Sequence, residues 1–157
     1  MLIGVVSDTH LKKHDTRFYY LARYYFRDCS IILHAGDIVD PEIFEGVDKN
    51  IFAVKGNMDF GVNLPNKRVI ELENVKIGLI HGYGAPQGIE KRVIKEFESE
   101  GIDCIVFGHT HKPYIGEFEG IKLFNPGSPF DNRYGSKRSI GFIEINGKEM
   151  KFKFEEI

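Results

Sequence analysis

The side chains best suited to chemistry in this sequence are carboxylates, imidazoles and one amide that follow short apolar runs. Asp8 and His10 follow the run 2–6, and His109 and His111 follow the run 104–107. The complete set of candidate metal ligands is Asp8, His10, Asp37, Asn57, His81, His109 and His111. If the runs are neighbouring strands, these side chains meet at the carboxyl ends of the sheet, where open α/β sheets bind ligands. Because a divalent cation offsets the cost of burying carboxylates, the pattern predicts a metal site.

The spacing of these donors indicates two metal ions rather than one. Asp-x-His at 8–10 and His-x-His at 109–111 place two side chains on the same side of an extended loop. The seven donors exceed one tetrahedral site and suit two sites that share a carboxylate. Asp37, in the middle of the ligand order, is the natural bridge. Imidazole, carboxylate and amide ligands without thiolate are compatible with Mn²⁺, Fe, Co²⁺, Ni²⁺ or Zn²⁺.

Each fragment also has a purely structural interpretation. Asp8 could sit in a turn or cap a helix, Asp37 and Asp40 could form a turn and a cap, and His81 could be a hydrogen-bonded core residue. The His-x-His fragment is the hardest to explain in this way. All the fragments together, in this order and each after an apolar run, favour the metal site.

Four further residues are predicted to stay outside this chemistry. His34 ends an apolar run and His14 lies among charged residues, so neither is expected to be a ligand. Cys29 and Cys104 are 75 positions apart and lie beside apolar residues. We therefore expect buried free thiols rather than a disulfide.

Length and composition predict one domain over residues 1–157. Lys and Arg number 21 against 23 Asp and Glu, a formal charge of -2, so no basic field recruits nucleic acid or anionic lipid. The sequence has no apolar run of membrane-spanning length, and the opening residues MLIGVV lack the features of a secretory signal. A cytoplasmic protein is expected.

The apolar runs are predicted as strands covered on both faces, over 2–6, 31–34, 51–55, 76–81 and 104–107. Apolar residues at helical spacing predict helices over 17–27 and 88–99, the second stopped by Gly101. Asp40-Pro41 predicts the start of a short helix over 41–47.

The second half of the chain predicts antiparallel hairpins. Their strand pairs are 67–72 with 76–81 across Glu73-Asn74, 114–119 with 122–125 across a Glu-Gly turn, and 139–145 with 149–154 across Asn146-Gly147. Parallel βαβ units followed by hairpins predict an α/β fold, a two-sheet sandwich with flanking helices.

An ordered series of motifs resembles the calcineurin-like metallophosphoesterase family, above all its small YfcE-type prokaryotic phosphodiesterases. The series is Asp8-x-His10, Gly36-Asp37-x-x-Asp40, Gly56-Asn57-x-Asp59, His81-Gly82 and Gly108-His109-Thr110-His111. The resemblance spans residues 2 to 128 and is far more specific than any single motif. It implies the calcineurin-like metallophosphoesterase fold. It also implies hydrolysis of phosphodiester bonds by a hydroxide activated between two divalent metal ions, with Mn²⁺ favoured.

The resemblance also implies individual roles. One metal would be held by Asp8, His10, Asp37 and His111, and the other by Asp37, Asn57, His81 and His109. The carboxylates of Asp40 and Asp59 would orient these ligands. Many family members carry a His directly after the motif Asn, where it is thought to protonate the leaving group, but this chain carries Met58. The departure favours diesters with better leaving groups, or protonation by water.

A second interpretation is a protein-binding scaffold. Residues 76–82 and Asn125-Pro126-Gly127-Ser128 also resemble Vps29, a retromer subunit with the same fold. The Vps29 pattern loses the Asp of the second motif and the Asn of the third. Asp37 and Asn57 are both present in this chain, so the enzyme is favoured.

Two surface features bear on partners. The segment 133–138 holds three basic residues, a modest cluster that is more typical of a solvated face than of a nuclease. On the helix 17–27, Tyr20 and Tyr24 fall opposite the apolar stripe, with arginines beside them. Aromatic and Arg side chains are enriched at interfaces, so this face predicts a homo-oligomer, against the alternative of scattered surface aromatics.

Overall fold

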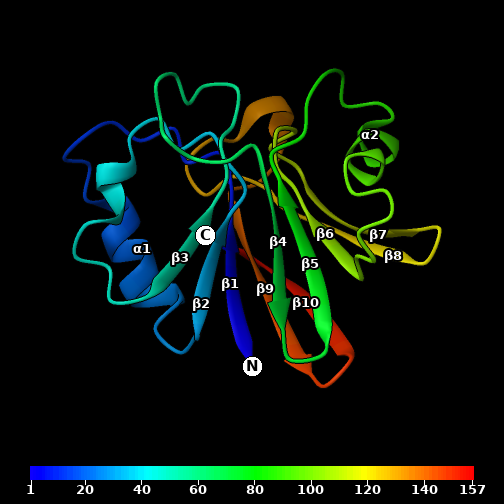
Figure 1. Ribbon diagram of the computed structural model, residues 1–157. Helices are drawn as coiled ribbons and strands as arrows, with labels where there is room; N and C mark the ends of the chain where they lie inside the picture. Colours follow the sequence, from blue (N-terminus) through cyan, green and yellow to red (C-terminus); the bar gives the residue numbers. More distant parts are fainter.

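Two mixed β-sheets pack face to face, and helices lie outside each sheet (Figure 1). This computed structural model describes the backbone of residues 1–157 and the side chains of all of them except Tyr134. The strands are β1 Leu2–Val6, β2 Ile31–His34, β3 Asn50–Ala53, β4 Lys67–Leu72, β5 Val75–Ile80, β6 Cys104–Val106, β7 Pro113–Phe118, β8 Ile121–Pro126, β9 Ser139–Asn146 and β10 Glu149–Glu156. One sheet has the order β10-β9-β1-β2-β3 and the other β4-β5-β6-β8-β7. The predicted two-sheet α/β sandwich with flanking helices is confirmed.

The central strands are apolar on both faces because each sheet is covered on both sides. In β2, Ile31 and Leu33 lie in the core between the sheets, whereas Ile32 packs in the core beneath helix α1, Arg17–Tyr25. In β5, Leu79 faces the space between the sheets and Ile80 packs beneath helix α2, Ile89–Lys95. Successive side chains of a strand point to opposite faces, so two apolar cores produce continuous apolar runs in the sequence.

Both helices are shorter than predicted. Helix α1 ends at Tyr25 instead of residue 27, and α2 ends at Lys95 instead of residue 99. After α2 the backbone tightens to i→i+3 hydrogen bonds, such as Phe97 N–H to the Ile94 carbonyl, while Phe97 stays in the core. The apolar spacing therefore continues past the α-helix, which ends six residues before Gly101.

The short helix after Asp40 has the predicted start and an earlier end. Asp40 Oδ1 accepts a hydrogen bond of 3.0 Å from the Glu42 amide, and Pro41 occupies the first turn. The element is a single 3₁₀ turn, η1 Pro41–Phe44, rather than a helix over 41–47. A second 3₁₀ turn is η2, Arg133–Gly135.

The last hairpin turns one residue later than predicted. Asn146 ends β9 and pairs with Glu149, so the turn is Gly147-Lys148 rather than Asn146-Gly147. Gly147 has φ +63° at the first central position, where a type II′ turn requires glycine.

The loops after the parallel strands gather at one edge of the sandwich, the upper edge of Figure 1. The loops after β1 and β2 are joined by Asp8 N–H to the Gly36 carbonyl and His10 N–H to the Asp37 carbonyl, both 2.9 Å. Gly108 N–H donates to the His81 carbonyl at 3.0 Å and joins the loops after β6 and β5. This is the edge, at the carboxyl ends of the parallel strands, where the sequence predicts the metal site. In the described residues no helix has the length and hydropathy needed to cross a membrane.

Candidate metal centre

All seven predicted ligands lie in one connected cluster at this edge. Two groups have ligand atoms within 4.8 Å of one another: Asp8, His10 and His111, and Asp8, Asp37 and His81. Asn57 Oδ1 lies 3.1 Å from both His81 Nε2 and His109 Nδ1, which joins the remaining two side chains to the cluster.

Five of these side chains stand on backbone in the left-handed region: Asp8 (φ 55°), His10 (φ 49°), Asp37 (φ 54°), His109 (φ 70°) and His111 (φ 58°). Asp and His tolerate this region better than most residues, yet each such position costs about 1–2 kcal/mol. Residues held in this way cluster at functional sites, because the surrounding structure must over-determine them.

The cluster has a buried floor and an open rim. Asp8, Asp37, His81 and His111 are buried. His10 and His109 are half-buried and Asn57 is exposed, so solvent reaches the donors from one side.

Asp8 has one oxygen engaged and one free. Its Oδ2 accepts the His109 amide at 3.1 Å, whereas the buried Oδ1 has no hydrogen-bond partner among the described residues. Oδ1 lies 3.2 Å from His111 Nε2 and 3.8 Å from His81 Nε2. Burial would raise the pKa of Asp8, but the close contact with His111 and the charge of His81 outweigh it and lower the pKa. The carboxylate is therefore ionised, with one oxygen facing the crevice.

Asp37 lies between imidazoles that belong to different predicted sites. Its Oδ2 is 3.6 Å from His10 Nε2 and 3.5 Å from His81 Nε2, while Oδ1 accepts the Met58 amide at 2.8 Å. Burial would raise the pKa of Asp37, but the close contact with His81 and the charge of that imidazole lower the pKa overall. Asp37 is thus placed as a bridge requires, and Asp8, common to both groups above, has a comparable position.

His81 and His109 are oriented by backbone carbonyls. His81 Nδ1–H donates to the Ala35 carbonyl at 2.7 Å, and His109 Nε2–H donates to the Gly84 carbonyl at 2.9 Å. Burial would lower the pKa of His81, but the contact with Asp37 and the charge of Asp8 raise it to about 8.

With the two imidazoles oriented in this way, three acceptor atoms point into one space. When both imidazoles are neutral, His81 Nε2, His109 Nδ1 and Asn57 Oδ1 are all acceptors, at the 3.1 Å separations given above. A proton or a cation must lie among them. Together with the unpartnered Asp8 Oδ1, this arrangement fits a divalent metal ion.

The two carboxylates predicted to orient the ligands have different roles. Asp59 is buried, and it accepts the amides of Val39 at 2.7 Å and Gly56 at 2.8 Å, so it ties the loop of Asp37 to the loop of Asn57. Asp40 instead caps η1 through its carboxylate, the alternative that the sequence left open.

Sequence reasoning did not place one further segment at the cluster, the end of β8 and the loop that follows it. Asn125 Nδ2 donates to the Gly108 carbonyl at 2.8 Å, and Ser128 Oγ donates to the Asp8 carbonyl at 2.8 Å. Asp131 Oδ2 lies 3.4 Å from His111 Nδ1. The Asn125-Pro126-Gly127-Ser128 motif was an available signal, but no spacing in the sequence connects Asp131 with His111.

His34 and His14 lie outside the cluster, as expected. The Gly36 amide donates to His34 Nδ1 at 3.2 Å, so His34 Nε2–H donates to Thr9 Oγ1 at 3.0 Å. Burial lowers the pKa of His34 to about 3. Both ring nitrogens are used inside the core, and His14 is exposed.

A cavity of about 350 Å³ opens directly beside Asn57 and His81. Its other walls include the side chains of Lys55, Asn66 and Tyr83. A small organic group has room there.

The chain is similar to known proteins in sequence and in structure. The model of the calcineurin-like phosphoesterase superfamily domain matches residues 1–148. A probable metallophosphoesterase of Methanothermobacter thermautotrophicus is 37% identical over 154 residues, covering 96% of this chain and 89% of its own. A phosphodiesterase of Methanocaldococcus jannaschii is 27% identical over 170 residues, covering 96% and 97%. Wild-type Vps29 of Entamoeba histolytica, complexed with Zn²⁺, has a TM-score of 0.77 at 26% identity, covering 100% and 98%.

Proposed function

The chain belongs to the calcineurin-like phosphoesterase superfamily, and from this premise we propose that it is a phosphodiesterase that works with two divalent metal ions. One observation carries the proposal. Asp37 Oδ2 lies 3.6 Å from His10 Nε2 and 3.5 Å from His81 Nε2, so a single carboxylate oxygen faces an imidazole of each ion site.

The ligand sets are those that the family resemblance implies. The first ion would be held by Asp8, His10, Asp37 and His111, and the second by Asp37, Asn57, His81 and His109. When bound, two such ions lower the pKa of a water molecule toward neutrality and polarise phosphoryl oxygens. Mn²⁺ is favoured, and Fe, Co²⁺, Ni²⁺ and Zn²⁺ suit the same ligands.

The chain's own residues position the phosphoester. The buried floor excludes bulk water, so the negative charges of Asp8 and Asp37 are weakly screened and attract the metal ions strongly. His10 and His109 flank the open side, where the phosphoryl group enters. The substrate is a small phosphodiester, one arm of which fits the cavity beside Asn57.

Met58 determines the preferred leaving group. Its side chain is 43% exposed at the rim and carries no proton to donate. An alkoxide leaving group needs a proton donor, so substrates whose leaving group departs without one are favoured. The likeness to a phosphodiesterase adds the expectation that diesters of this kind are hydrolysed faster than the matching monoesters.

The two thiols support a reducing compartment. Cys29 and Cys104 are both free and buried. Burial raises the pKa of Cys29 to about 11, which leaves it unreactive. This chemistry suits the cytoplasm, where disulfides are rare.

The proposal is tested by hydrolysis of bis(4-nitrophenyl) phosphate and 4-nitrophenyl phosphate after chelation and after return of Mn²⁺. Diester hydrolysis should appear only with metal and should exceed monoester hydrolysis. Asp37→Asn should abolish it, whereas Asp28→Asn, on the far surface beside Arg27, should not. Equal or faster monoester turnover would contradict the diester preference.

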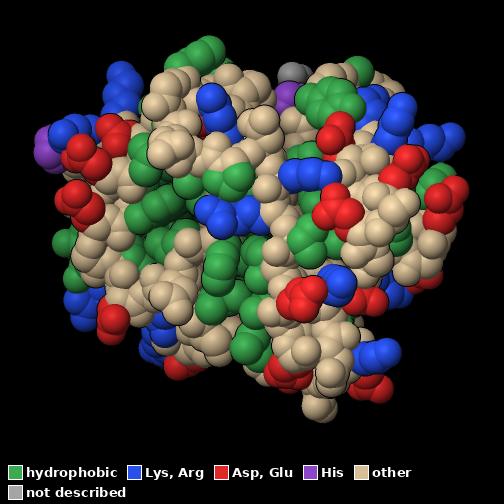
Figure 2. Space-filling view, viewed as in Figure 1, with side chains coloured by type: hydrophobic (Ala, Val, Ile, Leu, Met, Phe, Trp, Pro, Cys, Tyr) green, Lys and Arg blue, Asp and Glu red, His purple; other side chains and the backbone are tan. Residues whose placement is uncertain are grey.

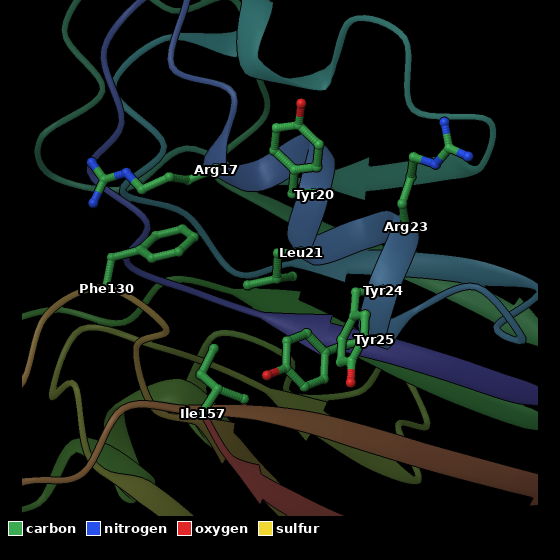
Figure 3. Close-up of a pocket in the computed structure, with 8 residues that line it drawn as sticks. All are labelled: Arg17, Tyr20, Leu21, Arg23, Tyr24, Tyr25, Phe130 and Ile157. Carbon is green, nitrogen blue, oxygen red and sulfur yellow. The ribbon is translucent and has the colours of Figure 1, made fainter.

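A protein-binding role is the second candidate, favoured by the likeness to Vps29 and by an apolar groove on α1. The groove has a volume of about 570 Å³ (Figure 3) and is lined by Arg17, Tyr20, Leu21, Arg23, Tyr24, Tyr25, Phe130 and Ile157. Tyr20 and Tyr24 are 65% and 71% exposed, as expected from the sequence. We propose that a second copy of the chain packs here. A metal-loaded protein inert toward both esters would make binding the primary role.

Nucleic acid is not favoured as a partner. On the face shown in Figure 2, basic and acidic side chains are interspersed over both sheets. Arg133 pairs with Asp131 at 2.7 Å and Lys137 with Glu156 at 2.8 Å, so two of the three basic residues at 133–138 are neutralised locally.

A further inference from the structure

We propose that Asp131 is a positioning residue for the first ion site, because its carboxylate sets the tautomer and orientation of His111. Loss of this carboxylate should weaken binding of one ion and leave the other unchanged. The inference rests on the proposed function, since it assumes that His111 binds an ion through Nε2.

The two ring nitrogens of His111 have different surroundings. Nε2 faces the cluster, 3.2 Å from Asp8 Oδ1 and 3.4 Å from His10 Nε2. Nδ1 is buried and has no hydrogen-bond partner among the described residues, yet it lies 3.4 Å from Asp131 Oδ2. A neutral imidazole carries one proton, so Nε2 can bind a cation only when that proton is on Nδ1. A carboxylate facing Nδ1 favours this tautomer.

The carboxylate of Asp131 is itself held in place. Arg133 Nε lies 2.7 Å from Oδ2, and the Arg133 amide donates to Oδ1 at 3.1 Å. The Asp131 amide donates to Ser128 Oγ at 3.1 Å, and that hydroxyl donates to the Asp8 carbonyl at 2.8 Å. The loop that carries Asp131 is therefore anchored to the segment that carries another ligand of the same ion.

The second site is built differently, which makes the expected effect selective. Its imidazoles, His81 and His109, donate to the backbone carbonyls of Ala35 and Gly84. A side-chain substitution cannot remove those acceptors. A carboxylate is also a stronger acceptor than a neutral carbonyl, so Asp131 contributes more to its imidazole than a backbone group would.

The alternative is that Asp131 forms only an Asp–Arg pair in a surface loop. The chain offers a matched control, because Asp28 also pairs with an arginine. The distance from Asp28 Oδ2 to Arg27 Nε is 3.3 Å, and this pair lies outside the cluster. Removing Asp28 deletes an arginine-paired carboxylate of the same kind. Any effect shared by both substitutions belongs to the surface pair and not to His111.

The experiment is calorimetric titration of Mn²⁺ into metal-free wild type, Asp131→Ala, Asp131→Asn and Asp28→Ala. Wild type and Asp28→Ala should show two binding events. Asp131→Ala should weaken one event by about 10–100-fold and leave the other unchanged, the usual effect of removing such an outer partner. Asp131→Asn keeps an acceptor oxygen and should weaken the same event less.

Nitrogen NMR of the histidines in the Zn²⁺-loaded proteins gives a readout that a merely structural role would not move. In wild type, His111 should be protonated on Nδ1 and bound through Nε2, and Asp131→Ala should change the signals of His111 alone.

Two unaltered binding events in Asp131→Ala would overturn the inference and leave the proposed function intact. Equal weakening of both events, or the same loss in Asp28→Ala, would also overturn it. A wild type that takes up one ion or none would contradict the two-ion function and remove the basis of the inference.

Discussion

Gly56 lies directly against the carboxylate of Asp37: a methyl group on its Cα would stand 2.2 Å from Asp37 Oδ1 and 2.3 Å from the Asp37 amide nitrogen. No real Cβ contact is that short. The backbone φ of Gly56 is not in the left-handed region, so glycine is required here by space alone. The position of the Asp37 carboxylate therefore depends on the absence of a side chain one residue before Asn57.

Gly56→Ala is expected to displace Asp37 and to weaken binding of both ions at least tenfold, measured by Mn²⁺ titration. Its free energy of unfolding should fall by about 1–3 kcal/mol, the cost of an overpacked buried position. Gly116→Ala is the control, because its new methyl group meets only the movable phenol of Tyr114. Unchanged metal affinity in Gly56→Ala would show that Asp37 is not the bridge.

Asp59→Ala should destabilise the metal-free protein, measured by urea unfolding. It leaves the part-buried amide of Val39 and the buried amide of Gly56 without their acceptors, and the buried donor alone costs about 1–3 kcal/mol. Val39 has φ +78°, which is strained for a β-branched residue, so this segment should relax when the bond is lost. Asp59→Asn should recover part of the loss, because one oxygen remains. A free energy of unfolding within error of wild type would contradict the role given to Asp59.

Deprotonation of His81 should make metal affinity rise with pH up to about pH 8, above which His81 adds no further pH dependence. The pKa of His81 is raised to about 8 in the metal-free protein, and an ion needs the unprotonated Nε2. Below that pH the bound proton must leave, so affinity should fall by up to about tenfold per pH unit. Titrations in buffers of different ionisation enthalpy would measure the released proton. Affinity independent of pH between 6.5 and 8 would contradict this account.

The raised pKa of His81 makes the stability of the fold depend on pH in the opposite direction to metal affinity. Folded His81 holds its proton more tightly than the unfolded chain, whose value is near 6.5, so its contribution to stability is complete below pH 6.5. That contribution is lost as the pH rises through about 8.

Tyr20→Ala/Tyr24→Ala should convert an oligomer to a monomer, measured by light scattering coupled to size exclusion. The two rings are exposed along one side of α1 and border the apolar groove of Figure 3. A two-fold contact through this face would bury both. The double variant should keep its diester hydrolysis, since the groove is lined by other residues than the metal cluster. A wild type that is already monomeric would leave the groove without this role.

The fold was predictable from the sequence because its signals are local. Each strand of a sheet covered on both faces is a short apolar run, and each hairpin has its own turn residues, so the two-sheet sandwich follows from neighbouring residues alone. The element ends were less predictable. The end of α2 is an example: Phe97 keeps the helical spacing because the core needs it, although the backbone has already tightened.

The metal centre, like the fold, could be predicted from the sequence only in part. The order of Asp, His and Asn after successive strands was sufficient to predict that these seven side chains lie together, because parallel strands deliver their carboxyl ends to one edge. Only the tertiary structure decided which atoms face one another. Ser128 and Asp8 are 120 positions apart, and the contact of Asp131 with His111 comes from a separate loop after β8. Such contacts depend on how two distant loops pack, and no spacing along the chain encodes that distance.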